Sequence, residues 1–437
     1  MMKKTFTLLL LLVIALYSAS GQQGNIKFTE YELPNGLHVI LHQDHATPNV
    51  IVSLMYHVGS KNEDPERTGF AHLFEHLMFE GSEYIERGEY FKLVQASGGT
   101  LNANTSFDRT YYFEMMPANQ LELALWMESE RMLHGKVDSI GVATQKGVVI
   151  EERKQSMDNS PYGTWIEELN KRLFRIHPYR WHIIGSPEHI QNSSFDDVFT
   201  FYKTYYVPNN CVLVIAGDFE EATVKGWVQQ YFGDIPRGVH PIYRPDVVEP
   251  LLQAEVRDVV YDKIQLPAIF MAYPSPAMGT QDAYAMELLT DILSNGKSAR
   301  LKTNITDKGI AMQAVAAGIE FEHPGALYVI AITNAGKTVE ELEEALDIEM
   351  ERVSNELVSE DEFQMVKAAK EFEVASGLTS LFSIAEQFAN NHTYYKDAGR
   401  INTQLQNYSN ITREDLQKVA QKYLNKNHRV VLHYLPE

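Results

Sequence analysis

The sequence predicts an α+β protein with two homologous halves, each an antiparallel-rich sheet with helices packed on one face. Three observations favour this architecture. The chain has 437 residues, which is more than one hydrophobic core usually supports. A short segment occurs twice, once near the middle of the chain and once near its end. Several prolines lie between the two parts, where neither helical nor strand periodicity survives.

The repeated segment closes each half of the chain. Residues 192–198 align without gaps on residues 410–416, an offset of 218 positions. Each copy has a hydroxyl side chain, Ser194 or Thr412, three positions before an aspartate, which is typical of the start of a helix. An apolar run typical of a strand follows in both copies. We expect a duplicated α+β unit, and the alternative is chance similarity between two short helix-strand units.

The proline-rich stretch marks the expected division of the chain. Its prolines are Pro236, Pro241, Pro245 and Pro250. We expect a first domain at residues 22–240, a linker at residues 241–254 and a second domain at residues 255–437.

The first 21 residues have the pattern of a secretory signal peptide. Lys3 and Lys4 precede an apolar run of ten residues at 8–17, and small residues follow at 18–21. Ten apolar residues are about half of what a membrane span needs, so we expect no anchor. The mature chain is therefore predicted to be exported, either to a periplasm or as a secreted protein.

Charge narrows the class of partner. Loss of Lys3 and Lys4 leaves 36 basic against 58 acidic residues, a net charge of −22. Nucleic acid is an unsuitable partner at that charge, whereas cationic peptides are compatible with it. The single cysteine, Cys211, lies in an apolar run and is expected to pack in a core.

Hydrophobic periodicity predicts the order of elements in each half. In the first half we expect strands at 31–41 and 49–58, a helix around residue 74, a helix at 83–96, two strands within 101–115 and helices through residue 152. In the second half we expect a strand at 268–273, a helix at 281–293, strands at 311–320 and 327–334, and helices at 339–353 and from residue 359. The second half has no metal motif, and we interpret its histidines as structural or solvated: His323, His392, His428 and His433.

The most informative motif is His72-Leu73-Phe74-Glu75-His76. On a helix, histidines four positions apart lie one turn apart on one face, so both can reach a single tetrahedral ion. Glu75 flanks them and can hold a water molecule. The pattern is the inverzincin signature of zinc hydrolases. The alternative is a surface helix with two solvated histidines.

The residues around the motif support a helix. Apolar residues recur at i, i+3, i+4 and i+7 and form one stripe opposite the histidines: Phe70, Leu73, Phe74 and Leu77. Thr68 precedes them and is the expected N-cap. A catalytic zinc site needs a third protein ligand, and residues 145–153 supply two adjacent carboxylates about 76 positions later. Neighbours on a helix differ in direction by about 100°, so only Glu151 or Glu152 can ligate, and chemistry alone does not decide which.

With these residues the chain resembles the pitrilysin/insulinase family of zinc metallopeptidases, which includes the mitochondrial processing peptidase. That family joins H-x-x-E-H to a glutamate some 75 residues later, and the match at residues 148–153 implies that Glu152 is the ligand. The resemblance extends to residues 58–63, 98–106 and 210–218, and so covers nearly the whole mature chain.

The resemblance implies a clamshell in which two halves face each other around a chamber. A peptide would lie extended along an exposed strand edge. The segment Thr100–Ser106 fits that role, and Asn102 and Ala103 match the family residues that contact the substrate backbone. The alternative for this segment is an ordinary edge strand whose asparagine caps a turn.

The implied activity is that of a zinc metalloendopeptidase with one Zn²⁺ per chain. The ligands would be His72, His76 and Glu152, and Glu75 would be the catalytic base that accepts a proton from water. Two alternatives are a non-catalytic assembly or peptide-binding subunit that kept the fold, and a zinc hydrolase that acts on something other than peptides.

One departure from the family pattern bears on partners. Family members that work alone place an Arg and, seven residues later, a Tyr in the second half, where they stabilise the oxyanion. Here Thr306 stands where the Arg is expected, and Met312 or Gln313 where the Tyr is expected. Arg300 lies six residues too early to substitute. We therefore expect a heterodimer with a related subunit that supplies the Arg and Tyr, with a homodimer or monomer as the alternative.

Overall fold

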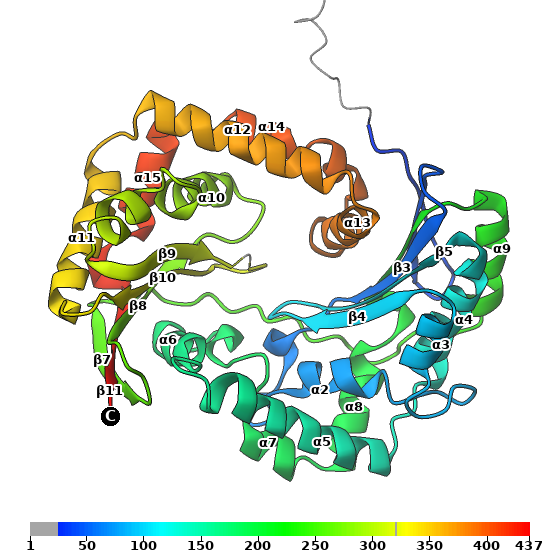
Figure 1. Ribbon diagram of the computed structural model, residues 1–437. Coiled ribbons are helices and arrows are strands. Elements are labelled where there is room, and N and C mark those ends of the chain that lie inside the picture. Colours follow the sequence, from blue (N-terminus) through cyan, green and yellow to red (C-terminus); the bar gives the residue numbers. More distant parts are fainter. Residues whose placement is uncertain (1–24, 320) are drawn as a thin grey trace, which may run out of the picture.

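The computed structural model describes residues 25–319 and 321–437, so the predicted signal peptide lies outside the described residues. The chain forms two sheets with helices around them, joined into an open arc (Figure 1). Among the described residues, none of the helices combines the length and the apolar character needed to cross a membrane.

The first half contains a sheet of six strands. Their order is β1 (Thr29–Glu32), β2 (His38–Gln43), β6 (Cys211–Gly217), β3 (Asn49–Tyr56), β5 (Thr110–Pro117) and β4 (Thr100–Thr105). Strands β2 and β6 run parallel, and the other neighbours are antiparallel. The predicted single strand at 31–41 is wrong, because a turn at Pro34-Asn35-Gly36 divides it into β1 and β2, with Gly36 at a φ of +87°.

Eight α-helices accompany this sheet. They are α2 (Phe70–Leu77), α3 (Tyr90–Ala96), α4 (Leu121–His134), α5 (Ser139–Arg153), α6 (Trp165–Leu173), α7 (Pro187–Asn192), α8 (Phe195–Tyr205) and α9 (Glu221–Phe232). The helix predicted at 83–96 begins only at Tyr90, since Gly88 adopts a φ of +78° that an α-helix does not accommodate. The helices predicted through residue 152 are confirmed as α4 and α5.

The second half repeats this plan with five strands. Their order is β7 (Val256–Asp262), β11 (Val430–Pro436), β8 (Ala268–Ser275), β10 (Gly325–Thr333) and β9 (Ala311–Gly318). The helices are α10 (Gln281–Ser294), α11 (Val339–Asn355), α12 (Glu360–Gly377), α13 (Leu381–Tyr395), α14 (Gln404–Ser409) and α15 (Arg413–Tyr423). The predicted elements of this half are confirmed within a few residues, and β7 is an element that periodicity did not predict.

The repeated segment forms the same unit in both halves. Helices α8 and α15 differ by 218 positions at both ends, and each begins with a capping box, at Ser194 and at Thr412. Each helix leads into a strand, β6 or β11, that pairs parallel with one neighbour and antiparallel with the other. The predicted duplication is therefore a duplication of topology as well as of sequence.

Each half also sends one helix across to the sheet of the other half. Leu169 and Leu173 of α6 pack with Phe270 beneath the second sheet. Ile384 and Phe388 of α13 pack against strands β3 and β6 of the first sheet. Each sheet therefore has its own helices on one face, as expected, and a helix from the other half on the opposite face. The two buried cores formed by α6 and α13 connect the halves. Residues 236–255, between the halves, contain no helix or strand.

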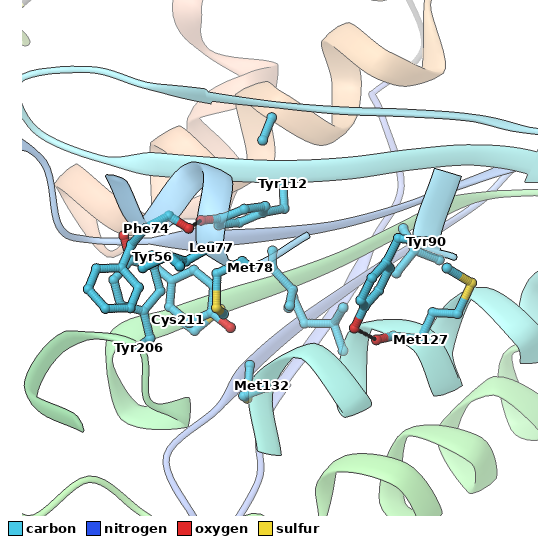
Figure 2. Packing of buried hydrophobic residues seen from close by; sticks show 14 of the residues in the cluster. Tyr56, Phe74, Leu77, Met78, Tyr90, Tyr112, Met127, Met132, Tyr206 and Cys211 are labelled. Atoms are coloured by element: carbon cyan, nitrogen blue, oxygen red, sulfur yellow. Dashed lines mark hydrogen bonds between the residues drawn. The ribbon is translucent and has the colours of Figure 1, made fainter. Parts of the chain in front are cut away.

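The main core of the first half fixes the helix that carries the histidine motif (Figure 2). Phe74 lies among Tyr56, Tyr112 and Tyr206, with ring centroids 5.0 Å apart for Phe74 and Tyr206. The Tyr112 hydroxyl donates a hydrogen bond of 2.9 Å to the Phe74 carbonyl and so ties α2 to strand β5. All four residues of the predicted apolar stripe are buried. Cys211 is a buried free thiol in the same core, as predicted.

Candidate metal centre

The start of helix α2 is held by a residue other than the predicted one. Gly69 is the N-cap residue, with a φ of +95°. Because glycine has no side chain that could cap the helix, the side chain of Glu63 does so instead. The Glu63 carboxylate accepts hydrogen bonds from the amides of Gly69 (2.9 Å) and Ala71 (2.8 Å). The predicted cap at Thr68 is wrong, because its hydroxyl instead contacts Nδ1 of His189 at 3.0 Å. A buried carboxylate therefore fixes the helix from outside its first turn.

Helices α2 and α5 bring the predicted ligand residues together. His72 Nε2 lies 3.5 Å from Oε1 of Glu152, and His76 Nε2 lies 3.2 Å from Oε2 of the same carboxylate. The two imidazoles are 4.8 Å apart between centroids and inclined at 79°. The three candidate ligand atoms lie within 4.8 Å of one another. One carboxylate and two imidazole nitrogens thus converge on a single point.

The neighbouring carboxylate points elsewhere. Glu151 pairs with Lys154 at 3.3 Å on the outer side of α5, and its side chain is 56% exposed. Of the two carboxylates that the chemistry of the sequence left open, only Glu152 faces the histidines.

The electrostatics of the centre suit a cation. Burial lowers the pKa of His72 to about 4, and the neighbouring His76 contributes to the same effect, so His72 is neutral at physiological pH. Burial also opposes protonation of His76, but its hydrogen bond to Glu152 and the charges of Glu152 and Glu75 outweigh burial and raise the pKa. The hydrogen bond from His76 lowers the pKa of Glu152, which is therefore ionised.

The donor set fits zinc. Zn²⁺ in catalytic sites takes three nitrogen or oxygen ligands from the protein and leaves a fourth position open. Here two Nε2 atoms and one carboxylate converge, and His72 Nδ1 is buried without a hydrogen-bond partner among the described residues. An ion bound at Nε2 would require the proton of the neutral His72 ring to be on Nδ1, because only the deprotonated nitrogen has a lone pair to donate.

Glu75 lies beside this centre and has a positioning partner that the sequence did not reveal. The Thr105 hydroxyl, on strand β4, donates a hydrogen bond of 2.6 Å to Oε2 of Glu75. Burial raises the pKa of Glu75, and the Thr105 hydrogen bond partly opposes this shift. No local pattern signals the contact, because the two residues are 30 positions apart and meet only when β4 passes over α2.

Strand β4 is the edge of the first sheet, as predicted. The Ser106 amide donates to the Arg109 carbonyl at 2.8 Å, so by the alternation of antiparallel ladders Ala103 directs its amide and carbonyl to the open side. Asn102 Oδ1 accepts the Ala103 amide at 2.9 Å. The two predicted substrate residues thus lie at an unpaired strand edge.

The second half offers no Arg at the expected position. Thr306 ends a short π-helix at Lys302–Thr306, and Met312 is 55% exposed on β9. Arg300 is held in a two-bond ion pair with Glu362 of α12, at 2.7 and 3.0 Å. The guanidinium of Arg300 is therefore already paired with a carboxylate of its own half.

Sequence reasoning missed a second cluster of similar composition. Glu30 of β1, His38 of β2 and His392 of α13 also place three ligand-type atoms within 4.8 Å of one another. His38 Nε2 lies 3.0 Å from Glu30, and the two imidazoles stack face to face at 3.4 Å and 13°. The sequence interpretation of His392 as structural or solvated does not include this cluster. The cluster has no sequence signal, because the crossing helix α13 alone brings His392 to the first sheet.

The chain is similar in sequence to a family of zinc peptidases. Residues 38–186 match the family described as Insulinase (Peptidase family M16), and residues 192–370 match the Peptidase M16 inactive domain. The zinc protease PqqE of Helicobacter pylori is 28% identical over 401 residues, covering 91% of this chain and 90% of that protein. An uncharacterized zinc protease of Mycobacterium leprae is 25% identical over 401 residues, with coverage of 90% and 88%.

Solved structures show the same architecture. The crystal structure of a protease from Helicobacter pylori superposes with a TM-score of 0.90 at 28% identity, covering 94% of this chain and all of that one. The periplasmic protease PqqL from Escherichia coli superposes with a TM-score of 0.74 at 17% identity, covering 94% of this chain but 47% of that one.

Proposed function

Because the chain belongs to the insulinase family of peptidases, peptidase family M16, we propose that it is a zinc-dependent endopeptidase. One observation carries the proposal: the ligand atoms of His72, His76 and Glu152 lie within 4.8 Å of one another, and Glu75 is on the same helix as the two histidines. A zinc ion held by these three ligands would act as a Lewis acid on the scissile carbonyl and acidify a water molecule.

The remaining chemistry belongs to residues of the chain. Glu75 accepts the proton of the attacking water and delivers it to the departing amine, and burial, which raises the pKa of Glu75, makes it a stronger base. The Thr105 hydrogen bond holds one oxygen of Glu75 and leaves the other for the water. Burial of α2 against the tyrosine-rich core keeps these groups in place.

The open edge of β4 is the proposed binding site for the peptide backbone. An extended peptide would add a strand beside β4 and pair with the backbone amide and carbonyl of Ala103. Asn102 would exchange its bond to the Ala103 amide for a bond to the peptide. Because Thr105 ends the same strand and contacts Glu75, a peptide bound at this edge passes the base.

The experiment that tests this function separates metal from base. Glu75→Gln should keep about one zinc per chain yet lower peptide hydrolysis by about 10²–10⁴-fold, as expected for loss of a general base. Metal analysis and a fluorogenic peptide assay measure the two effects. A zinc-free wild-type chain that still hydrolyses peptides would refute the mechanism. A zinc-loaded wild type without peptidase activity, alone or with a partner, would favour a non-catalytic binding subunit.

We further propose that the active form is a heterodimer with a related subunit. The described second half lacks an Arg at position 306 and binds Arg300 to Glu362, so the oxyanion donors must come from elsewhere. The Escherichia coli neighbour is about twice as long as the region that this chain matches, which leaves room there for a second such unit. Addition of a paralogue without H-x-x-E-H should raise kcat/KM about 100-fold; full activity of the isolated chain would contradict this.

We also propose that residues 1–21 are a signal peptide and that the mature protein is exported. The succession of a basic, an apolar and a small-residue segment at the N-terminus supports this proposal. N-terminal sequencing of the protein from its native host should give a first residue near Gln22, and an intact Met1 would contradict export by this route.

A further inference from the structure

A polar pocket lies beside the proposed active site, between the two halves. The loop after β4 forms one wall, and helices α10, α13 and α14 of the second half form the others. Its volume is about 230 Å³, and the lining residues that matter here are Ser106, Arg109, Tyr284, Glu287, Tyr394 and Arg400. Ser106 directly follows Thr105, whose hydroxyl binds Glu75. The pocket is therefore one residue along the chain from the base contact.

The pocket is on the face of the β4 edge opposite to α2. Thr105 points towards α2, where it contacts Glu75. Its neighbour Asn104 points the other way and bonds Arg109, whose guanidinium pairs with Glu386 of α13 at 2.8 Å. A peptide added to this edge alternates its side chains between the same two faces. Side chains that face away from the metal centre near the scissile bond therefore point towards α13 and the pocket.

Arg400 is the cation of the pocket for which the described residues supply no ion-pair partner. The charge of Arg109 is matched by Glu386. Glu287 accepts a hydrogen bond from Tyr408 and interacts electrostatically with Lys370. Arg400, in contrast, forms no ion pair within the part of the chain that the structure describes.

Two tyrosines hold Arg400 in a fixed orientation. It donates a hydrogen bond of 2.7 Å to the Tyr284 hydroxyl, and its guanidinium carbon lies 3.8 Å from the centroid of the Tyr395 ring. A guanidinium stacked on a ring keeps its edge available for a carboxylate. The orientation of Arg400 is therefore set before any ligand arrives.

We propose that this pocket is a specificity subsite for an acidic side chain, Asp or Glu, of the bound peptide, and that Arg400 is the residue that recognises it. This proposal rests on the proposed peptidase function and specifies its substrate class. The volume is below the roughly 300–1,000 Å³ typical of pockets for whole small ligands, and it suits a single side chain.

The net charge of the whole chain refines the substrate class. At a formal net charge of −20, the surface repels a strongly acidic peptide at long range. Charge beyond about 8–10 Å is screened at physiological salt, so Arg400 acts only within its pocket. The expected substrate is therefore a neutral or basic peptide with one acidic residue, placed within a few positions of the scissile bond.

Equilibrium binding tests the subsite without catalysis. The full-length Glu75→Gln chain, loaded with zinc, is titrated with a fluorescent basic peptide set in which one position at a time is Glu or Gln. At one position the Glu peptide should bind about 10-fold more tightly than its Gln counterpart, as one charged hydrogen-bonded contact allows. Equal binding at every position would overturn the proposal, whether or not the wild type hydrolyses peptides.

Variants of Arg400 identify the recognition residue. Arg400→Gln in the same background should reduce the Glu-over-Gln preference to about twofold or less, and Arg400→Glu should reverse it in favour of Gln. Arg400→Lys keeps the charge and should keep part of the preference, which guards against a folding defect in the other two. The matched control is Arg352→Gln, since Arg352 pairs with Glu349 on α11, outside the pocket. A preference that survives Arg400→Gln would overturn the assignment.

The peptidase assay then distinguishes failure of the proposed subsite from failure of the proposed peptidase function. If the zinc-loaded wild type cleaves peptides but shows no acidic preference in binding or cleavage, the subsite is refuted and the peptidase function stands. If it binds Glu peptides preferentially through Arg400 but cleaves none, either alone or with the related subunit, the subsite stands and the proposed function fails.

Discussion

Among the residues that the structure describes, two groups each bring together two histidines and one glutamate, and only one group has the geometry of a metal centre. In the group at His72, the imidazoles are inclined at 79°, so their in-plane lone pairs converge on the Glu152 carboxylate. In the group at His38, the imidazoles are stacked at 3.4 Å and 13°, so their lone pairs lie in nearly parallel planes and cannot meet at one ion. Composition and proximity are alike in the two groups, and ring orientation differs. A metal centre is therefore recognised by the directions of its lone pairs.

The difference has a cause in the backbone. His72 and His76 are on one helix, where a spacing of four residues fixes both side chains on one face. His38 and His392 come from a strand of the first sheet and a helix of the second half, and their rings meet as neighbours in a packed interface. The first arrangement is set by local sequence, whereas the second depends on how the two halves dock.

The largest expected effect separates the two groups directly. His76→Ala should remove zinc and abolish peptide hydrolysis, because only two ligands remain. His392→Ala should leave about one zinc per chain and retain hydrolysis. Metal analysis of both purified variants, after dialysis against a weak chelator, measures the effect. Two zinc ions in the wild type, with one lost in His392→Ala, would show that the stacked group also binds metal.

A second comparison concerns the adjacent carboxylates of α5. Glu152→Ala should weaken zinc binding by at least about 100-fold, since even loss of outer partners of metal ligands costs 10–100-fold. Glu151→Ala removes a surface pair with Lys154 and should change the zinc affinity less than about twofold. Competition with a chromogenic chelator gives both affinities. The reverse result would mean that α5 is rotated by one residue from the orientation described here.

Much of this site was predictable because its parts are local. The residues of the motif at 72–76 are brought to one face by a helix alone, and the apolar stripe of α2 predicts that helix. The family resemblance supplied Glu152. What sequence could not supply were contacts made by folding: Glu63 as the cap of α2 and Thr105 as the partner of Glu75.

The fold shows the same division. The repeat predicted the common topology of the halves, since it includes the capping boxes of α8 and α15. The turn between β1 and β2 was missed, although Pro34-Asn35-Gly36 is a turn signal, because apolar residues continue on both sides of it. The crossing of α6 and α13 has no sequence signature, because a helix buried against either sheet needs the same kind of apolar stripe.

A smaller effect is expected at Thr105, whose hydroxyl orients the base. Thr105→Val keeps the shape of the side chain and removes the hydrogen bond to Glu75, so kcat should fall about 10-fold while KM and zinc content change little. Thr105→Ser should restore most of the rate. Steady-state kinetics on peptide substrate distinguishes this result from a structural defect, which would change zinc content or thermal stability in both variants.

The smallest expected effect comes from the stacked group and concerns pH. Burial, together with the charges of His38 and Lys396, lowers the pKa of His392 to about 3, so the folded chain resists protonation there. The unfolded chain takes up this proton below about pH 6.5, and stability is therefore lost as pH falls from 6.5 towards 3. Between pH 7 and pH 5 the His392→Phe variant should lose about 1 kcal/mol less of its free energy of unfolding than the wild type, after allowance for solvent screening. Urea unfolding of zinc-free protein at both values measures it, with the exposed His240→Phe as the control. Equal losses in wild type and His392→Phe would show that the stacked histidines do not couple the docking of α13 to pH.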